Sequence, residues 1–162
     1  MPRTARPRST AADPAWLQLD RQLCFALYSA SLAMTKLYKP LLQPLGLTYP
    51  QYLAMLVLWE RDGIVVSELG QRLMLDSGTL TPLLKRLEGA GLVQRLRDSA
   101  DERRVLLRLT PAGRALKARA AELPQQVACA AGCRLDELTA LTARLKALRD
   151  QVVAASVQPE AA

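Results

Sequence analysis

The chain has 162 residues and a formal net charge of +7, and 50% of its residues are hydrophobic. This length suits one domain of ordinary size, and no apolar run is long enough to span a membrane. The absence of histidine removes His-based acid–base catalysis and most zinc or haem sites, so we expect no enzyme, no metal and no cofactor. Three cysteines, behind an N-terminus unlike a secretory signal, favour a reducing cytoplasm.

The N-terminal part predicts a tail and then a long helix. Residues 1–12 carry three arginines and no acid, and we expect them to form a disordered basic tail. Asp13 followed by Pro14 predicts a helix start, because Asp is a good N-cap and Pro suits the first helical position. The apolar period that follows predicts that this helix runs toward Tyr38, that Pro40 and Pro44 end it, and that Gly46 turns the chain.

A second helix is predicted to open at a capping box. Thr48 and Gln51 have the spacing in which each side chain bonds the other residue's backbone N–H. We expect the buried stripe of this helix to contain Leu53, Leu56, Val57 and Trp59.

Residues 64–110 have the order of a winged helix-turn-helix. Two short helical patterns lie on either side of residues 74–76, which are too few for more than a turn. Asp76 is a good N-cap for the second helix, whose apolar stripe contains Leu80, Leu83, Leu84 and Leu87. Two β-type runs then flank a polar tip at residues 97–104, and a short strand at residues 64–66 lies beside them. The fold class is therefore mainly α with a small β wing.

This order places one helix in a major groove and the wing on an adjacent minor groove of double-stranded DNA. On the second helix we expect Thr79, Thr81 and Lys85 to contact bases, with Ser77 and Arg86 on phosphates. At the wing, Arg103 is expected to enter the minor groove. The arginines expected behind it are Arg95, Arg97 and Arg104.

Further helices follow the wing. Thr110 and Pro111 repeat the cap signature of a helix start, and Pro124 indicates a break or a restart. Residues 134–153 carry a leucine stripe, which suits either an intramolecular core or a partner helix.

A winged helix needs only about half of this chain, so the flanking helices must bury apolar faces elsewhere. A two-fold homodimer does this, and it presents two recognition helices about one DNA turn apart to a pseudo-palindromic operator.

Three segments carry a resemblance to a known family. They are LCFALYSA (Leu23–Ala30), LDSGTLTPLLKRLE (Leu75–Glu88, with a proline inside the recognition helix) and the D-x-x-D-x-R wing (Asp98–Arg103) that leads to LTPAG. Over residues 16–153 the chain resembles the MarR family and, within it, the OhrR group of organic hydroperoxide sensors. The organisation that follows is a tail (1–12), N-terminal dimerisation and sensing helices (13–63), the winged helix (64–110), C-terminal dimerisation helices (111–155) and a second tail (156–162).

Cys24 is either a small buried hydrophobe or a reactive thiol. Tyr38 lies fourteen residues further on, about four helical turns, so it cannot reach Cys24 along a straight helix. The resemblance implies that the partner subunit supplies phenols at Tyr38 and Tyr49, and Tyr28 lies on the same helix face as Cys24. Phenolic donors stabilise a thiolate, and apolar walls favour hydroperoxides with organic tails.

Cys129 and Cys133 share a face if their segment is helical, but they lack the further ligands that a metal site needs. A resolving thiol, which condenses with oxidised Cys24 to a disulfide, is the better interpretation. The resemblance implies that this thiol is Cys129 of the opposite subunit, with Cys133 as a spare. The expected function is a dimeric repressor that releases its operator when an organic hydroperoxide oxidises Cys24.

Three other functions fit parts of the sequence. A MarR-type repressor with passive cysteines would be released by a small aromatic ligand. A thiol peroxidase would need a threonine or arginine close to its cysteine, which Cys24 in the middle of a helix lacks. A helical interaction protein would bind no DNA.

Overall fold

The computed structural model describes residues 14–97, 101 and 104–157. The chain forms two units, Met1–Lys36 and Leu37–Ala162, and helix α1 (Leu23–Leu42) belongs to both. The bounds of the other helices and strands are α2 (Tyr49–Glu60), β1 (Ile64–Val65), α3 (Val66–Leu73), α4 (Ser77–Gly89), β2 (Val93–Arg97), β3 (Val105–Leu109), α5 (Pro111–Ala120), α6 (Leu123–Ala130) and α7 (Leu135–Val157). The predicted class, mainly helical with a small β wing, is confirmed.

The predicted continuous helix from Pro14 is wrong. Two short 3-10 turns, Pro14–Leu17 and Leu19–Arg21, precede α1, and Gln18 and Gln22 next to the second turn are extended. The side chain of Gln22 donates to the carbonyl of Trp16, and such local bonds compete with the helical ladder. Asp13, the expected cap, lies outside the described residues.

The predicted end of this helix at Pro40 and Pro44 is confirmed, because the last residue of α1 is Leu42, between the two prolines. A proline in the last turn removes only one backbone bond, and burial of the residues after it offsets that loss. Leu42 is 1% exposed within the core, and the chain leaves the helix through the left-handed Gly46.

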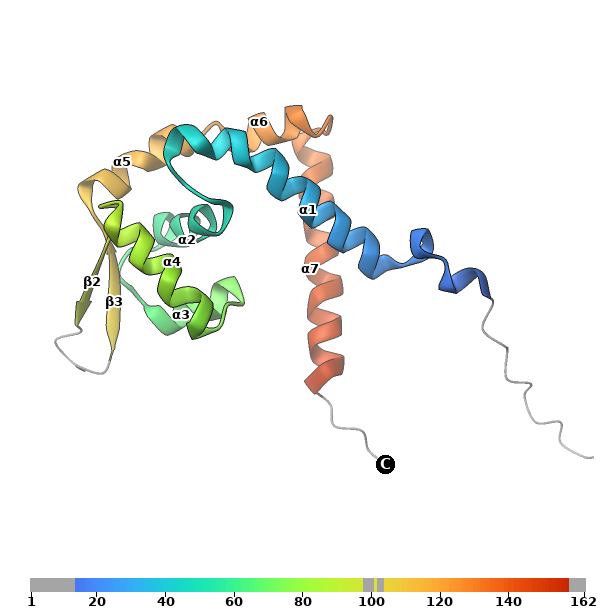
Figure 1. Ribbon diagram of the computed structural model, residues 1–162, viewed down its shortest axis with the longest axis horizontal. Helices are drawn as coiled ribbons and strands as arrows, with labels where there is room; N and C mark the ends of the chain where they lie inside the picture. The colour runs from blue at the N-terminus through green and yellow to red at the C-terminus, as the bar shows by residue number, and fades with distance from the viewer. Residues whose placement is uncertain (1–13, 98–100, 102–103, 158–162) are drawn as a thin grey trace, which may run out of the picture. The chain divides into compact units, whose positions relative to one another are not determined.

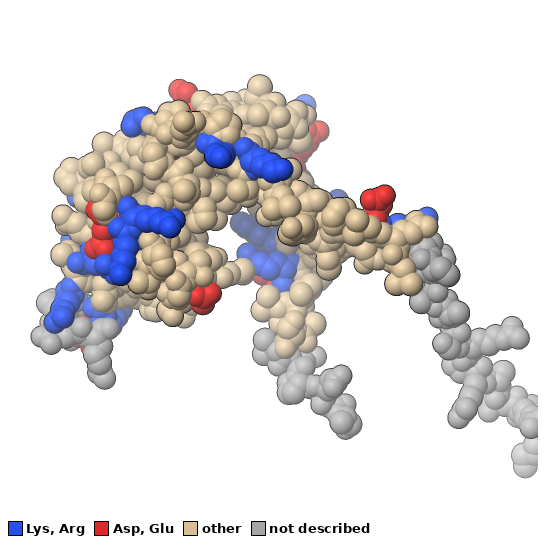
Figure 2. Space-filling model, in the orientation of Figure 1, with Lys and Arg blue, Asp and Glu red and all other residues tan. Residues whose placement is uncertain are grey.

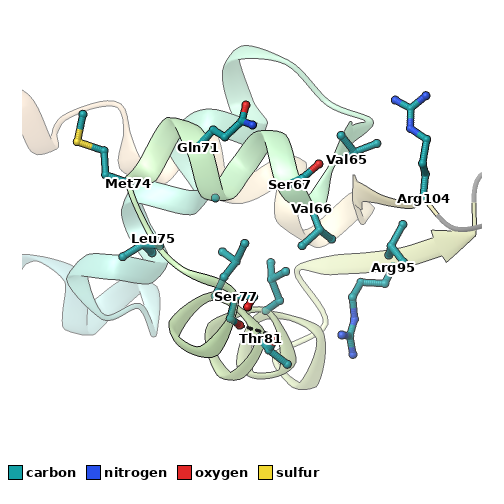
Figure 3. A pocket seen from close by; sticks show the side chains of 14 residues that line it. Val65, Val66, Ser67, Gln71, Met74, Leu75, Ser77, Thr81, Arg95 and Arg104 are labelled. Atoms are coloured by element: carbon teal, nitrogen blue, oxygen red, sulfur yellow. Dashed lines mark hydrogen bonds between the residues drawn. The ribbon is translucent and has the colours of Figure 1, made fainter. Parts of the chain in front are cut away.

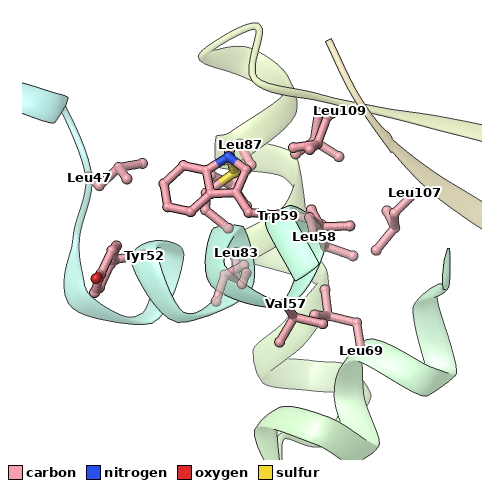
Figure 4. Packing of buried hydrophobic residues seen from close by; sticks show 14 of the residues in the cluster. Leu47, Tyr52, Val57, Leu58, Trp59, Leu69, Leu83, Leu87, Leu107 and Leu109 are labelled. Carbon is pink, nitrogen blue, oxygen red and sulfur yellow. The ribbon is translucent and has the colours of Figure 1, made fainter. Parts of the chain in front are cut away.

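α2 is the central helix of the second unit. The predicted capping box is present, with the backbone N–H of Thr48 donating to Gln51 Oε1 at 2.8 Å. The predicted stripe is only partly right, because Leu56 is exposed and Leu53 is half-buried. Since α2 packs against α3, α4 and α5, it buries more than one face (Figure 4), including Tyr52, Ala54, Met55 and Leu58.

The winged helix-turn-helix follows the predicted order. α3 and α4 pack against one another beside the hairpin of β2 and β3 (Figure 1). The sheet has the order β1-β3-β2 with antiparallel pairs, in which Val93 pairs with Leu109 and Ile64 with Leu107. The four leucines predicted for the stripe of α4 are all buried. This packing leaves the opposite face of α4 outside the core.

The C-terminal helices begin where the prolines predict. Thr110 caps α5 by accepting from the backbone N–H of Gly113 at 3.0 Å, and Pro124 lies in the first turn of the restarted helix α6. On α7, Leu141 and Leu145 of the leucine stripe are exposed, so the stripe does not complete the core of the chain itself. Within the described residues, no helix combines the length and hydropathy that crossing a bilayer requires.

Candidate functional site

The start of α4 is fixed by Asp76, as predicted. Asp76 Oδ1 accepts from the backbone N–H of Thr79 at 2.8 Å, and Oδ2 accepts from the Thr79 hydroxyl at 3.1 Å. These hydrogen bonds, the backbone one first, lower the pKa of Asp76 below its ordinary value. The carboxylate is therefore ionised at neutral pH and holds the first turn of the helix.

Thr79 and Thr81 of α4 donate their hydroxyl protons in hydrogen bonds within the helix start. Thr81 donates to the carbonyl of Ser77 at 2.8 Å, as Thr79 donates to Asp76, and both side chains are exposed. A hydroxyl whose proton is bound within the helix still accepts hydrogen bonds. In a major groove, such an acceptor suits the amino groups of adenine and cytosine.

Basic side chains gather over α4 and the hairpin (Figure 2). Lys85 and Arg86 are exposed on α4. Arg97, the last residue of β2, and Arg104, the residue before β3, are exposed at the hairpin. Arg103, expected at the tip of the wing, lies outside the described residues. This face therefore combines hydroxyl groups with cations, as a surface that contacts bases and phosphates requires.

Arg95 has a second partner that the sequence did not predict. Its guanidinium lies 2.5 Å from Glu88 Oε2, and its backbone N–H donates to Glu88 Oε1 at 3.2 Å. Because Glu88 is in the last turn of α4 and Arg95 is in β2, the pair joins the recognition helix to the wing.

An open groove of about 690 Å³ lies between α3, α4 and the hairpin (Figure 3). Ser77 and Thr81 line it from α4, Gln71 from α3, and Arg95 and Arg104 from the hairpin. Four of the expected DNA contacts, two from the helix and two from the hairpin, thus border the same groove.

Three of the four tyrosines form one cluster. The rings of Tyr38 and Tyr49 have centroids 4.7 Å apart, and those of Tyr38 and Tyr52 lie 5.8 Å apart. Burial, followed by the proximity of Tyr49 and Tyr52, raises the pKa of Tyr38 to about 12. Burial also raises the pKa of Tyr49 and of Tyr52. All three phenols are protonated at neutral pH and can donate a hydrogen bond to an anion.

The cysteines lie in separate elements. Cys24 is exposed in the first turn of α1, and the fourth tyrosine, Tyr28, is exposed one turn later. Cys129 is exposed in α6. No three His, Cys, Asp or Glu side chains of residues 14–97, 101 and 104–157 cluster as a metal site.

The condition under which Cys129 and Cys133 would share a helix face is not met. α6 ends at Ala130, and the left-handed Gly132 turns the chain before Cys133. The Cys133 thiol donates to the carbonyl of Ala131 at 3.4 Å and is only partly exposed. Cys129 is therefore the more accessible of the two.

Tyr52 and Trp59 were missed as candidate functional residues, although Trp59 was expected in the core. The signal was their spacing, since Tyr49, Tyr52 and Trp59 stand at i, i+3 and i+10 on one helix. In a chain with four tyrosines and two tryptophans, three aromatic residues on one twelve-residue helix are a concentration that could have been noticed.

A helix-turn-helix followed by a wing, with hydroxyl and basic groups on its outer face, defines a winged-helix transcriptional regulator that binds DNA. Residues 36–120 match the family model described as transcriptional regulator SarA/Rot. The chain is 54% identical over 134 residues to the HTH-type transcriptional regulator TtmR of Methylorubrum extorquens (strain PA1), covering 83% of this chain and 69% of TtmR. It is 55% identical over 108 residues to the organic hydroperoxide resistance transcriptional regulator of Bacillus subtilis (strain 168), covering 67% of this chain and 74% of that protein.

Solved structures agree with these relatives. Reduced AbfR bound to DNA has a TM-score of 0.69 and 32% identity, over 86% of this chain and 98% of AbfR. Disulfide-formed AbfR has a TM-score of 0.59 and 32% identity, over 86% and 94% of the two chains. MarR of E. coli has a TM-score of 0.62 and 28% identity, over 78% and 96%. The chain belongs to the MarR family of transcriptional regulators, in the group that includes the Bacillus subtilis protein.

Proposed function

We propose that this regulator is a homodimeric repressor that senses organic hydroperoxides through Cys24. The observation that carries the proposal is the half-buried pair of phenols, Tyr38 and Tyr49, which stay protonated and can donate to a thiolate. In the dimer, these donors reach Cys24 of the partner subunit, and Tyr28 joins them from the helix that carries the thiol. The name of the Bacillus subtilis relative supports the choice of oxidant.

The oxidation proceeds in two steps. The Cys24 thiolate attacks the terminal oxygen of a hydroperoxide, so that an S–O bond forms, the O–O bond breaks and an alcohol leaves after taking up a proton. The Cys129 thiol of the partner subunit then attacks the sulfenic sulfur, which forms the disulfide and releases water. The exposure of Cys24 and of Cys129 allows both reactions, and the solved disulfide form of AbfR supports such a state.

The reduced dimer holds its operator through α4 and the wing. Thr79, Thr81 and Lys85 read bases in the major groove, while Ser77 and Arg86 bind phosphates. At the wing, Arg103 enters the minor groove, with Arg95, Arg97 and Arg104 near the backbone. The exposure of the side chains expected on α4 supports these roles.

The decisive experiment is a gel shift on the DNA upstream of the protein's own gene, with and without cumene hydroperoxide and then with dithiothreitol. The wild type should release the DNA on oxidation and bind it again after reduction. Cys24→Ser should bind as tightly as the wild type and should not be released. Release of Cys24→Ser by the hydroperoxide, or release of the reduced wild type by a small aromatic acid alone, would contradict the proposal.

The disulfide pairing has its own test on a non-reducing gel. Hydroperoxide should convert the wild type and the matched control Cys133→Ser into a covalent dimer, whereas Cys129→Ser should remain monomeric on the gel. A covalent dimer of Cys129→Ser would show that another thiol resolves the sulfenic acid.

A further inference from the structure

One helix joins the phenol cluster to the base of the wing. α2 carries Tyr49 at its start, Tyr52 one turn later and Trp59 near its end. The Tyr52 ring contacts Tyr38 at 5.8 Å and meets the Trp59 ring edge-on, with centroids 6.3 Å apart. Tyr52 is 4% exposed and Trp59 is 9% exposed, and Figure 4 shows both rings within the apolar packing. The aromatic contacts therefore run without interruption from Tyr38 to Trp59.

Trp59 is fixed to α5 at two points. Its indole Nε1 donates to the carbonyl of Gly113 at 2.9 Å in a buried hydrogen bond. Its own backbone carbonyl accepts from Lys117 Nζ, also at 2.9 Å. Because α5 begins at Pro111, two residues after β3 ends, the bond to Gly113 links the indole to the base of the hairpin.

Gly113 also touches the other strand at the base of the hairpin, where Val93 of β2 pairs with Leu109 of β3. A Cβ at this position would lie 2.1 Å from the carbonyl oxygen of Leu92, the residue before β2, so only glycine fits. The same carbonyl accepts from the backbone N–H of Thr110 at 3.0 Å, and the Thr110 hydroxyl donates to the carbonyl of Gly91. The base of the wing, where the two strands meet, is thus held together beside Gly113, whose carbonyl accepts the indole hydrogen bond.

We propose that Tyr52 and Trp59 form a relay that couples the sensor phenols to the wing. This inference rests on the proposed function, because it assigns to Tyr38 the donation to Cys24 of the partner subunit. Oxidation of Cys24 removes the thiolate and displaces the Tyr38 ring. The close packing of Tyr52 and Trp59 then passes the displacement to Gly113, and the wing changes its angle to the DNA. Tyr52 and Trp59 act only through these neighbours and touch neither the thiol nor the DNA.

Trp59→Phe tests the relay, because it keeps an aromatic ring and removes the donor to Gly113. Trp16→Phe is the matched control, since it makes the same change at the other tryptophan, which is exposed in the first unit. The dissociation constant for the upstream DNA is measured by fluorescence anisotropy for the reduced protein and for the hydroperoxide-treated protein. The rate of loss of the Cys24 thiol is measured in parallel.

For Trp59→Phe we expect wild-type operator affinity in the reduced state and a wild-type rate of thiol loss. The weakening of DNA binding on oxidation should be smaller than in the wild type by about fivefold, as loss of one ordinary hydrogen bond allows. Trp16→Phe should weaken on oxidation as the wild type does. In that control Trp59 is the one remaining tryptophan, and its emission should change on oxidation and recover on reduction.

A second pair of variants tests the ring contact. Tyr52→Phe keeps the ring and should respond as the wild type does, whereas Tyr52→Leu should show the same reduced response as Trp59→Phe. Two results would overturn the relay. One is a ratio of oxidised to reduced affinity in Trp59→Phe equal to that of the wild type. The other is a Trp59 emission, measured in Trp16→Phe, that does not change on oxidation. If instead the wild type is not released by hydroperoxide, the proposed function itself fails.

Discussion

The chemistry of Tyr38 depends on where its ring lies rather than on the residue type. Its phenol is half-buried against Tyr49 and Tyr52, and this setting raises its pKa to about 12. Because a phenol that holds its proton more firmly remains a donor over a wider pH range, the cluster can stabilise a thiolate without becoming an anion itself. The same shift must appear in the stability of the protein.

Stability should fall as the pH rises from about 10 to about 12. In this window the unfolded chain releases the Tyr38 proton while the folded chain keeps it, so rising pH favours unfolding. The contribution is complete below about pH 10 and is lost as the pH passes about 12. Urea unfolding across this range should show a shallower fall for Tyr38→Phe than for the wild type. Equal slopes would contradict the cause given for the shift.

Tyr38→Phe should also slow the oxidation of Cys24 by hydroperoxide. Loss of one hydrogen bond to a charged group is worth about 1.5 kcal/mol, which is about tenfold in rate. The measurement is the loss of reactive thiol with time at neutral pH. Tyr52→Phe is the control, because it makes the same change in the same cluster at a residue without a proposed donor role, and it should react as the wild type does.

At the scale of elements, α4 depends on its cap. Asp76 satisfies the Thr79 backbone N–H at the helix start and also binds the hydroxyl of Thr79. Asp76→Ala should therefore lower the free energy of unfolding by about 1 kcal/mol, and it should weaken operator binding because it frees the first turn. Asp76→Asn keeps an acceptor and should lose less of both. Chemical denaturation and anisotropy measure the two effects, and equal losses in Ala and Asn would exclude capping as the cause.

Elements with local signals could be predicted from the sequence, and those set by distant contacts could not. The cap at Asp76, the capping box at Thr48 and the hairpin strands follow from residues a few positions apart. The end of α1 between Pro40 and Pro44 follows in the same way. The buried faces of α2 do not, because the helices that pack against it, α3, α4 and α5, lie further along the chain. The turn before Cys133 has a local signal in Gly132, whose left-handed backbone stops the helix.

The candidate site shows the same division. The hydroxyl and basic residues of α4 could be named because they alternate with a clear leucine stripe, which leaves them on the outer face. The bond between Trp59 and Gly113 spans 54 positions, and the pairing of Arg95 with Glu88 requires the packing of a strand on a helix. No local pattern contains either contact.

At the scale of the whole molecule, α7 exposes an apolar surface. Leu141 is 51% exposed and Leu145 is 39% exposed on one side of this helix, and leucine side chains in water are unfavourable when a second copy can cover them. The helices of each copy would bury these residues against the other in the homodimer that the proposed function requires. A charge placed at these positions tests this burial.

Leu141→Asp combined with Leu145→Asp should dissociate the dimer. Full burial of a leucine contributes about 1.5–3 kcal/mol, and roughly half of that is left to gain at each of these two half-exposed side chains. Since two-fold symmetry counts each change twice, the dimer dissociation constant should rise by at least about a hundredfold. Ala147→Asp places the same charge at an exposed position on another side of α7 and is the matched control. Sedimentation velocity over a dilution series measures the dissociation constant. A dimer that survives the double substitution would locate its interface elsewhere, whereas loss of both dimer and operator binding, with Ala147→Asp unaffected, would show that the paired recognition helices depend on this stripe.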